Sequence, residues 1–273
     1  MKKICIMSSK AKTYIDHLVG IGEISFTIGQ MQQEMGITNK AARRALERLR
    51  RDREIVSLAK GYYLILTPEF REQGCLPPNY FIDDLMAYWN KPYYVGLLSA
   101  AMFHGAAHQQ PQIFQVMLAL TRPRIIRGKV TIDFIQNSSC MKTPVQKMKT
   151  PSGTVSVSTP EATAMDLVKY IRQSGGINRV ATVLHELFEN IKIDKLLSLT
   201  HLFGESAWVQ RLGFLLDELG YEEQAESLYQ YLGSVKTRTI PLVPYLPVSD
   251  VEKNKKWRIA INAIVKSDLD DTY

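Results

Sequence analysis

The chain has 273 residues, 45% of them hydrophobic and 22% charged, and a formal net charge of +7. This length suffices for one large or two modest domains, and the composition is that of an ordinary globular protein. Because Cys5, Cys75 and Cys140 are scattered and no apolar stretch has the length of a signal-peptide core or a transmembrane helix, the sequence predicts a cytoplasmic protein without disulfides and without a membrane partner.

The first two predicted helices span 9–20 and 28–35. Apolar residues follow helical spacing in the first of them, and Gly20 ends it. Phe26 and Thr27 have the pattern of a hydrophobic staple and an N-cap, so the second helix is expected to begin directly after them. Its apolar side chains, expected to point inward, are Ile28, Met31 and Met35.

The third predicted helix, 37–53, has a narrow apolar face and an almost wholly cationic opposite face, with Thr38 near its N-cap. Residues 40–53 include seven basic and two acidic side chains, whereas a merely solvated helix face usually mixes the two signs. One α-helix fits into a DNA major groove, so the cationic face is expected to bind DNA. The apolar face consists of Ile37, Ala41, Ala42, Ala45, Leu46 and Leu49, and the opposite face of Lys40, Arg43, Arg44, Glu47, Arg50 and Arg51.

Two β-prone runs, 55–58 and 62–66, follow this helix and form a predicted hairpin. A hairpin after a recognition helix is a wing, and Lys60 at its tip is expected to reach a phosphate or the neighbouring minor groove. Residues 1–66 hold 12 basic and 6 acidic side chains, whereas the remaining 207 residues hold 22 and 21. The order of the elements and the local excess of positive charge predict a winged helix-turn-helix DNA-binding domain over 1–67.

Positions along the basic helix differ in the contacts expected with double-stranded DNA. Its first two turns usually meet base edges, and the residues there are Thr38, Asn39, Lys40, Arg43 and Arg44. Of these, Arg43 and Arg44 are the candidates for bidentate contact with guanine O6 and N7. Glu47 is expected either to accept from a cytosine amine or to orient an arginine. The further DNA-binding candidates, chiefly for phosphates, are Arg48, Arg50, Arg51 and Lys60, whereas Arg53 is a candidate cap of the helix C-terminus.

The remaining residues, 68–273, are predicted to form a larger domain. Because it contains both helices and strands, the predicted fold class is mixed α+β. Helices are expected from Pro78 to about Trp89, near 94–104, and over 160–231 in four or five segments divided at glycines. An extended stretch at 257–261 is expected to return to the sheet. The strands, all within about 112–158, are expected at 112–120, 124–136, 145–150 and 154–158, with the last two as a hairpin.

The candidate catalytic and metal-ligating residues lack the further residues that a catalytic or metal site needs. His104 and His108 are four apart, as in a zinc protease, but Gly105 stands where the catalytic glutamate would be, and no third ligand follows. Asp268 and Asp270 resemble the paired aspartates of nucleotidyltransferases, without the upstream phosphate-holding element. The sequence therefore predicts a non-enzyme with no cofactor and no metal.

Several blocks of the chain resemble the AbiEi family, the antitoxins and transcriptional regulators of AbiE abortive-infection systems. The most distinctive blocks are 93–101 and 104–112, and the others are 61–65, 69–71, 76–83, 159–168 and 256–259. The resemblance implies a winged helix joined to an antitoxin domain over 68–273. It also implies repression of the protein's own operon through inverted repeats, and neutralisation of a nucleotidyltransferase toxin without a stable complex, the type IV arrangement.

A polar segment near 104–112 follows an apolar helix and is the candidate surface for action on the toxin, because loops often carry function. The candidate residues are Ser99, His104, His108, Gln109 and Gln110. An alternative gives the protein no autoregulatory role: the larger domain binds a protein or RNA, and the winged helix tethers it to DNA.

Overall fold

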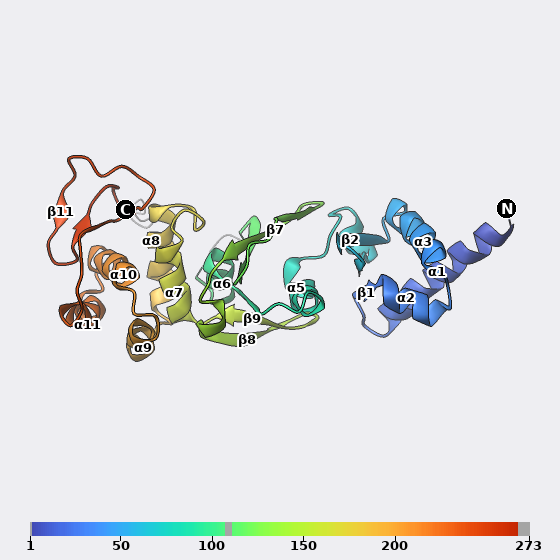
Figure 1. The fold of residues 1–273 in the computed structure, drawn as a ribbon, viewed down its shortest axis with the longest axis horizontal. Coiled ribbons are helices and arrows are strands. Elements are labelled where there is room, and N and C mark those ends of the chain that lie inside the picture. The colour runs from blue at the N-terminus through green and yellow to red at the C-terminus, as the bar shows by residue number, and fades with distance from the viewer. Residues whose placement is uncertain (1, 107–110, 267–273) are drawn as a thin grey trace. The chain divides into compact units, whose positions relative to one another are not determined.

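The computed structural model describes residues 2–106 and 111–266, and Figure 1 draws it as a ribbon. The chain packs into two compact units, each assembled from three segments. The N-terminal unit comprises 1–93, 112–138 and 147–156, and the C-terminal unit comprises 94–111, 139–146 and 157–273. The boundary expected after residue 67 lies inside the N-terminal unit, so a separate domain over 1–67 stays a prediction. The predicted α+β class is confirmed.

The N-terminal unit begins with α1 (Lys2–Gly20), β1 (Ser25–Thr27) and α2 (Ile28–Met35). α1 starts before the predicted residue 9, because Lys and Met are good helix formers even where apolar periodicity is weak. α2 begins as predicted. The hydroxyl of Thr27 accepts from the N–H of Gln30 at 3.2 Å, and Oε1 of Gln30 accepts from the N–H of Thr27 at 2.6 Å. This reciprocal capping box fixes the first turn of α2.

The basic helix and the wing follow as α3 (Asn39–Arg51), β2 (Ile55–Ala59) and β3 (Tyr62–Ile65). Gly61, with a φ of +80°, takes the left-handed conformation that the tight turn between the strands requires. β1, which was not predicted, adds to β3, and the sheet order is β1-β3-β2. Helices followed by such a hairpin are the arrangement of a winged helix, as predicted. Their common core is Ala11, Tyr14, Ile15, Leu18, Phe26, Met31, Ala45, Leu46, Leu49, Ile55 and Ile65.

Beyond the wing, the N-terminal unit contains two helices and further strands. The predicted single strand over 124–136 is wrong, because Gly128 turns the chain at a φ of +53°. The two resulting strands, β6 and β7, pair antiparallel, and β5 pairs parallel with β7. The elements are α4 (Pro68–Arg71), which was not predicted, α5 (Pro78–Tyr88), β5 (Ile113–Leu118), β6 (Ile125–Arg127) and β7 (Val130–Gln136). The predicted hairpin of β8 (Val145–Thr150) and β9 (Gly153–Ser158) has residues in both units.

The C-terminal unit is mainly helical. The predicted helix at 94–104 begins later than expected, because β-prone residues first form β4 (Tyr93–Val95), which pairs parallel with β9 through Val95 and Val157. No helix in the described part of the chain is both long and apolar enough to cross a membrane. The helices are α6 (Leu97–Phe103), the 3-10 helix η1 (Cys140–Lys142), α7 (Pro160–Lys169), α8 (Ile177–Phe188), α9 (Ile193–Phe203), α10 (Ser206–Glu218) and α11 (Glu222–Gly233).

The last strands form a small sheet of their own, with the order β10-β12-β11. The expectation that 257–261 returns to the six-stranded sheet, whose order is β6-β7-β5-β4-β9-β8, is therefore wrong. Instead, fully buried Trp257 packs onto α10, where a Cβ atom on Gly213 would lie 2.0 Å from the indole ring. The indole N–H donates to Asp217 at 2.6 Å, which fixes the ring over the glycine. The strands are β10 (Ile240–Pro241), β11 (Lys253–Asn254) and β12 (Ile259–Ala260).

Replacing Gly213 with alanine tests this close approach. Because the added methyl group overlaps a buried and hydrogen-bonded indole, Gly213→Ala is expected to lower the free energy of unfolding by roughly 2–3 kcal/mol in urea denaturation. Gly233→Ala is the matched control, since no atom lies within 4 Å of the added Cβ at that helical position, and it is expected to be neutral or stabilising by up to about 1 kcal/mol. Equal effects of the two substitutions would contradict the packing described.

Candidate nucleic-acid interface

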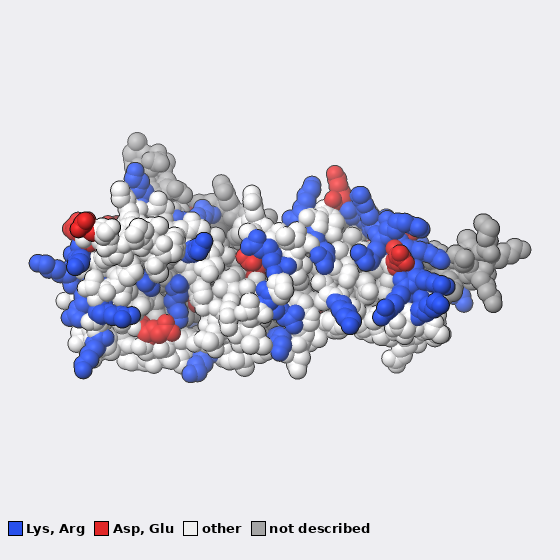
Figure 2. All heavy atoms as spheres, turned by 45° about the horizontal axis from the view of Figure 1, so that its top comes forward, with Lys and Arg blue, Asp and Glu red and all other residues white. Residues whose placement is uncertain are grey.

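The packing of α3 decides which of its side chains face solvent. Ala42, Leu46 and Leu49 are buried against the winged-helix core, and the small alanines let the helix lie close to its support. The opposite face is exposed, and half-buried Arg48 lies at its edge. The exposed residues are Thr38, Asn39, Lys40, Arg43, Arg44, Glu47, Arg50 and Arg51. Figure 2 shows Lys and Arg side chains gathered over this part of the N-terminal unit.

The turn before α3 fixes the direction in which the helix starts. Gly36 takes the left-handed conformation, with a φ of +61°, and ends α2. The Thr38 hydroxyl then accepts from the N–H of Ala41 at 3.4 Å, as an N-cap. The amide of Asn39 donates to Gln32 at 3.3 Å and so ties the first turn of α3 to α2. The helix-turn-helix geometry thus comes from local hydrogen bonds that the sequence pattern predicts in part.

The end of α3 has an ion pair on its exposed face. Arg51 and Asp52 form this pair at 3.6 Å, and a pair this exposed contributes little to stability. The expected role of Arg53 as a cap for the helix is only partly right. Its backbone N–H donates to the carbonyl of Arg50 at 3.1 Å, whereas its side chain lines a cavity beside the wing.

The wing is held in place by contacts that the sequence analysis missed. The hydroxyl of Tyr88 donates to the carbonyl of Lys60 at 2.9 Å, at the tip of the hairpin. The guanidinium of Arg127 donates to the carbonyl of Ser57 at 2.6 Å, on β2. Lys60 itself is exposed. The concentration of basic residues over 122–129 was the available signal for Arg127, but the predicted continuous strand hid the turn that positions it.

Asp166, on α7, is a fully buried carboxyl group of the C-terminal unit. Its Oδ2 accepts from the hydroxyl of Tyr94 at 2.7 Å, and both side chains are fully buried. Its other oxygen, Oδ1, has no hydrogen-bond partner among the described residues. Burial therefore raises the pKa of Asp166 to about 7, although the Tyr94 hydroxyl and Lys169 act in the opposite direction.

The structure changes the candidate partner surface near α6. Ser99 is 1% exposed, which removes it from any surface open to a partner. Nε2 of half-buried His104 lies 2.7 Å from the carbonyl of Ser158, and since a carbonyl only accepts, Nε2 carries the hydrogen. Nδ1 is then the acceptor for the Gln146 amide at 3.4 Å. Burial lowers the pKa of His104, so the ring is neutral near pH 7.

With both ring nitrogens engaged, His104 is a poor metal ligand in this conformation. In the part of the chain that the structure describes, no three His, Cys, Asp or Glu residues are grouped so that they could hold a metal ion. Cys75 and Cys140 are buried, and burial raises the pKa of the two thiols to about 12 and about 11. The remaining candidates, His108, Gln109, Gln110, Asp268 and Asp270, lie outside the described residues.

Comparison with known proteins finds a family match over the middle of the chain. Residues 94–218 match the family model of the AbiEi antitoxin C-terminal domain. These residues are an AbiEi antitoxin domain. The match begins at Tyr94, where the C-terminal unit begins, and contains both His104 and Asp166. The resemblance drawn from the sequence is confirmed.

A solved structure shares the fold over almost the whole chain. The Rv2827c protein from Mycobacterium tuberculosis superposes with a TM-score of 0.67, at 16% sequence identity, over 91% of this chain and 90% of that one. At this identity the likeness concerns the fold, which extends beyond the AbiEi antitoxin domain to the winged helix. No curated protein matches the chain.

The buried carboxyl group of the AbiEi antitoxin domain leads to a prediction about pH. Between about pH 4 and pH 7 the unfolded state has released the proton of Asp166 and the folded state has kept it, so folding stability falls as the pH rises. Asp166→Asn keeps an acceptor for Tyr94 and cannot ionise. From pH 5 to pH 8, the stability of this variant relative to the wild type is expected to rise by roughly 1–3 kcal/mol in urea denaturation.

Asp16→Asn is the control, because it removes an exposed carboxylate from α1. Parallel stability profiles for the wild type and Asp166→Asn over this pH range would show that Asp166 is ionised in the folded protein.

Proposed function

We propose that the protein is a transcriptional repressor and antitoxin that acts in the cytoplasm. As a repressor it binds double-stranded DNA at inverted repeats in its own promoter, through α3 and the β2–β3 wing. The observation that carries this proposal is the exposed cationic face of α3, which is held outward by a buried apolar face and followed by a hairpin with Lys60 at its tip. A helix so displayed has the dimensions and the charge to enter a major groove.

Contacts with base edges are proposed for the first two turns of α3. Arg43 and Arg44 there carry the forked donors that match guanine O6 and N7, each worth about 1–3 kcal/mol of discrimination. Glu47 lies one turn further on and accepts from a cytosine amine or orients an arginine. The other residues of these turns are Thr38, Asn39 and Lys40.

Phosphate contacts, which set affinity and register but not sequence, are proposed for the end of α3 and for the wing. Their positions along the chain let them follow the DNA backbone on either side of the groove. These residues are Arg48, Arg50, Arg51 and Lys60.

The double variant Arg43→Ala, Arg44→Ala is expected to lose sequence preference while remaining folded, because both side chains are exposed. In a gel-shift titration on the region upstream of its own gene, its affinity should fall about 30-fold or more, toward that for unrelated DNA of equal length. Lys195→Ala with Lys236→Ala removes the same charge from exposed positions of the C-terminal unit and is the matched control.

Wild-type affinity in the Arg43, Arg44 variant at moderate salt would refute the assignment of α3 as the reading helix. A salt titration of the wild type adds a second check, since neutralisation of several phosphates predicts a steep loss of affinity as salt rises.

The antitoxin role rests on the AbiEi antitoxin domain over residues 94–218. We propose that this domain counteracts a nucleotidyltransferase toxin without forming a stable complex. Because α3 (Asn39–Arg51) lies outside the matched residues 94–218, neutralisation should not need its cationic face.

Co-expression with such a toxin tests this role. Growth is expected to recover with the wild type and equally with the Arg43→Ala, Arg44→Ala variant, and the toxin is not expected to co-purify. Co-purification in a stoichiometric complex would contradict the type IV arrangement. Failure of both proteins to restore growth would favour the alternative, in which the larger domain binds another protein or RNA.

A further inference from the structure

A cavity of about 590 Å³ lies beside the wing, within the N-terminal unit. Its walls come from the end of α3, from β2, from the segment after α4 and from the turn between β6 and β7. Among the described residues that line it, five are cationic and only Glu72 is acidic; the cations are Arg50, Arg53, Arg71, Arg127 and Lys129. Of this set, only Arg50 is among the DNA contacts proposed above, as a phosphate contact.

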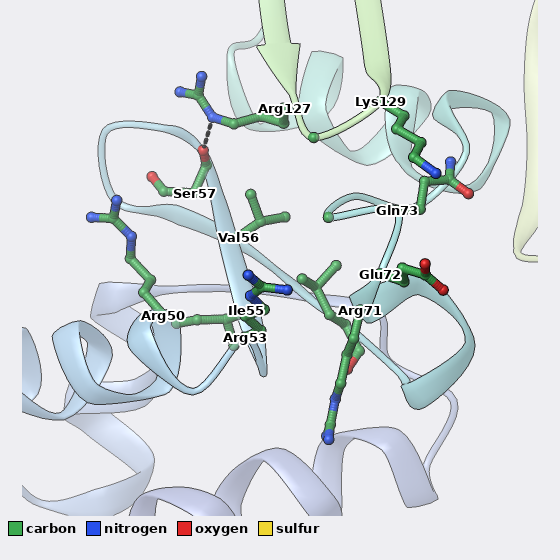
Figure 3. Close-up of a pocket in the computed structure, with 13 residues that line it drawn as sticks. Arg50, Arg53, Ile55, Val56, Ser57, Arg71, Glu72, Gln73, Arg127 and Lys129 are labelled. Atoms are coloured by element: carbon green, nitrogen blue, oxygen red, sulfur yellow. Dashed lines mark hydrogen bonds between the residues drawn. The ribbon is translucent and has the colours of Figure 1, made fainter.

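Figure 3 shows how these side chains are arranged around the cavity. Arg50 and Arg53 come from the end of α3 on one side, whereas Arg127 and Lys129 come from the β6–β7 turn on the other. Arg71 extends away from the others, and its Nε donates to the carbonyl of Leu66 at 3.3 Å. The cavity therefore presents cations from two elements that are far apart in the sequence.

The β6–β7 turn is rigidly seated against the segment after α4. The N–H of Lys129 donates to the carbonyl of Gln73 at 2.9 Å. Gly128 approaches the same segment so closely that a Cβ atom would lie 2.0 Å from that carbonyl oxygen and 2.8 Å from Cα of Gly74. Only glycine fits there, at a φ of +53°. The backbone that carries Arg127 and Lys129 is thus fixed relative to the wing.

The cations of the 122–129 segment divide into two groups. Arg124 is paired with Asp133 at 2.7 Å, and the guanidinium of Arg122 lies 3.7 Å from the centre of the Trp89 ring. Arg127 donates from Nε to Ser57 and from Nη1 to Ile126, which leaves three of its five N–H groups for other acceptors. Lys129 has no ion pair with an acid in the described part of the chain. The second group, Arg127 and Lys129, lines the cavity.

We propose that this cavity binds a phosphate-bearing ligand. Guanidinium groups and an ammonium group that line one cavity match the charge and the oxygens of several phosphates better than those of a single carboxylate. The volume lies in the range of small-molecule sites and exceeds the needs of one orthophosphate. The ligand therefore carries several phosphates, either as a free oligophosphate compound or as consecutive phosphates of DNA that flanks the operator.

The first experiment uses inorganic tripolyphosphate as the probe and the full-length protein without DNA. Isothermal titration is expected to show saturable binding with a Kd below about 1 mM, weakened at least about tenfold in Arg53→Gln with Lys129→Gln. Both substituted side chains are exposed, and neither carries a contact that fixes the wing. Lys195→Gln with Lys236→Gln is the charge-matched control and should bind as the wild type does.

Absence of saturable binding to the wild type, or equal weakening by the cavity and control substitutions, overturns the proposal. If the cavity double variant fails to fold, as judged by its thermal unfolding, Lys129→Glu replaces it, because one exposed turn residue then reverses its charge. The same tenfold loss is required of that variant.

A second experiment distinguishes the two sources of phosphate. The affinity for a minimal operator duplex is compared with that for a duplex extended by about ten base pairs at each end. Flanking DNA is the ligand if the extension strengthens binding to the wild type and not to the cavity variant. A free oligophosphate compound is the ligand if tripolyphosphate binds as expected and the extension has the same effect on both proteins. Failure of the proposed function would be detected separately, because the DNA affinity of the Arg43→Ala, Arg44→Ala variant tests it.

Discussion

The burial of one face of α3 is the constraint on which the rest of the N-terminal unit depends. Ala45, Leu46 and Leu49 occupy the winged-helix core, and Ala42 is buried as well. Because these side chains face inward, the arginines on the opposite face of the helix must point outward. Burial of the apolar face thus determines that the positively charged side chains of α3 face solvent, although the buried residues make no contact with DNA themselves. The repulsion between the cations is a cost that the buried face offsets in the unbound protein and that an anionic partner would relieve.

The wing depends on a different kind of interaction. Its core residues seat β2 and β3, but the tip and the outer strand are tied to the rest of the N-terminal unit through backbone carbonyls, by Tyr88 at Lys60 and by Arg127 at Ser57. Because these bonds go to backbone carbonyls, they do not depend on which side chains the wing residues have. The side chains of the wing can therefore be substituted to fit a different path of the DNA backbone, while the wing keeps its position.

Residues with a local pattern were predictable from the sequence, and those defined by distant contacts were not. The periodicity of α3, the Thr27 and Thr38 caps and the turn at Gly61 are all encoded within a few neighbouring residues. The turn at Gly128 was missed because its glycine is required by the carbonyl of Gln73, more than fifty residues away in the chain. The burial of Ser99 and Asp166 depends on helix packing that a single sequence does not reveal.

The division of each compact unit into three segments has a consequence for biosynthesis. The winged-helix core is complete once β3 has been made, but the N-terminal unit as a whole also needs residues 112–138 and 147–156. A ribosome must therefore translate well into the middle of the chain before the arginine that anchors the wing can reach it. During that interval the residues of the basic helix and of the wing have been synthesised, but the arginine that anchors the wing has not.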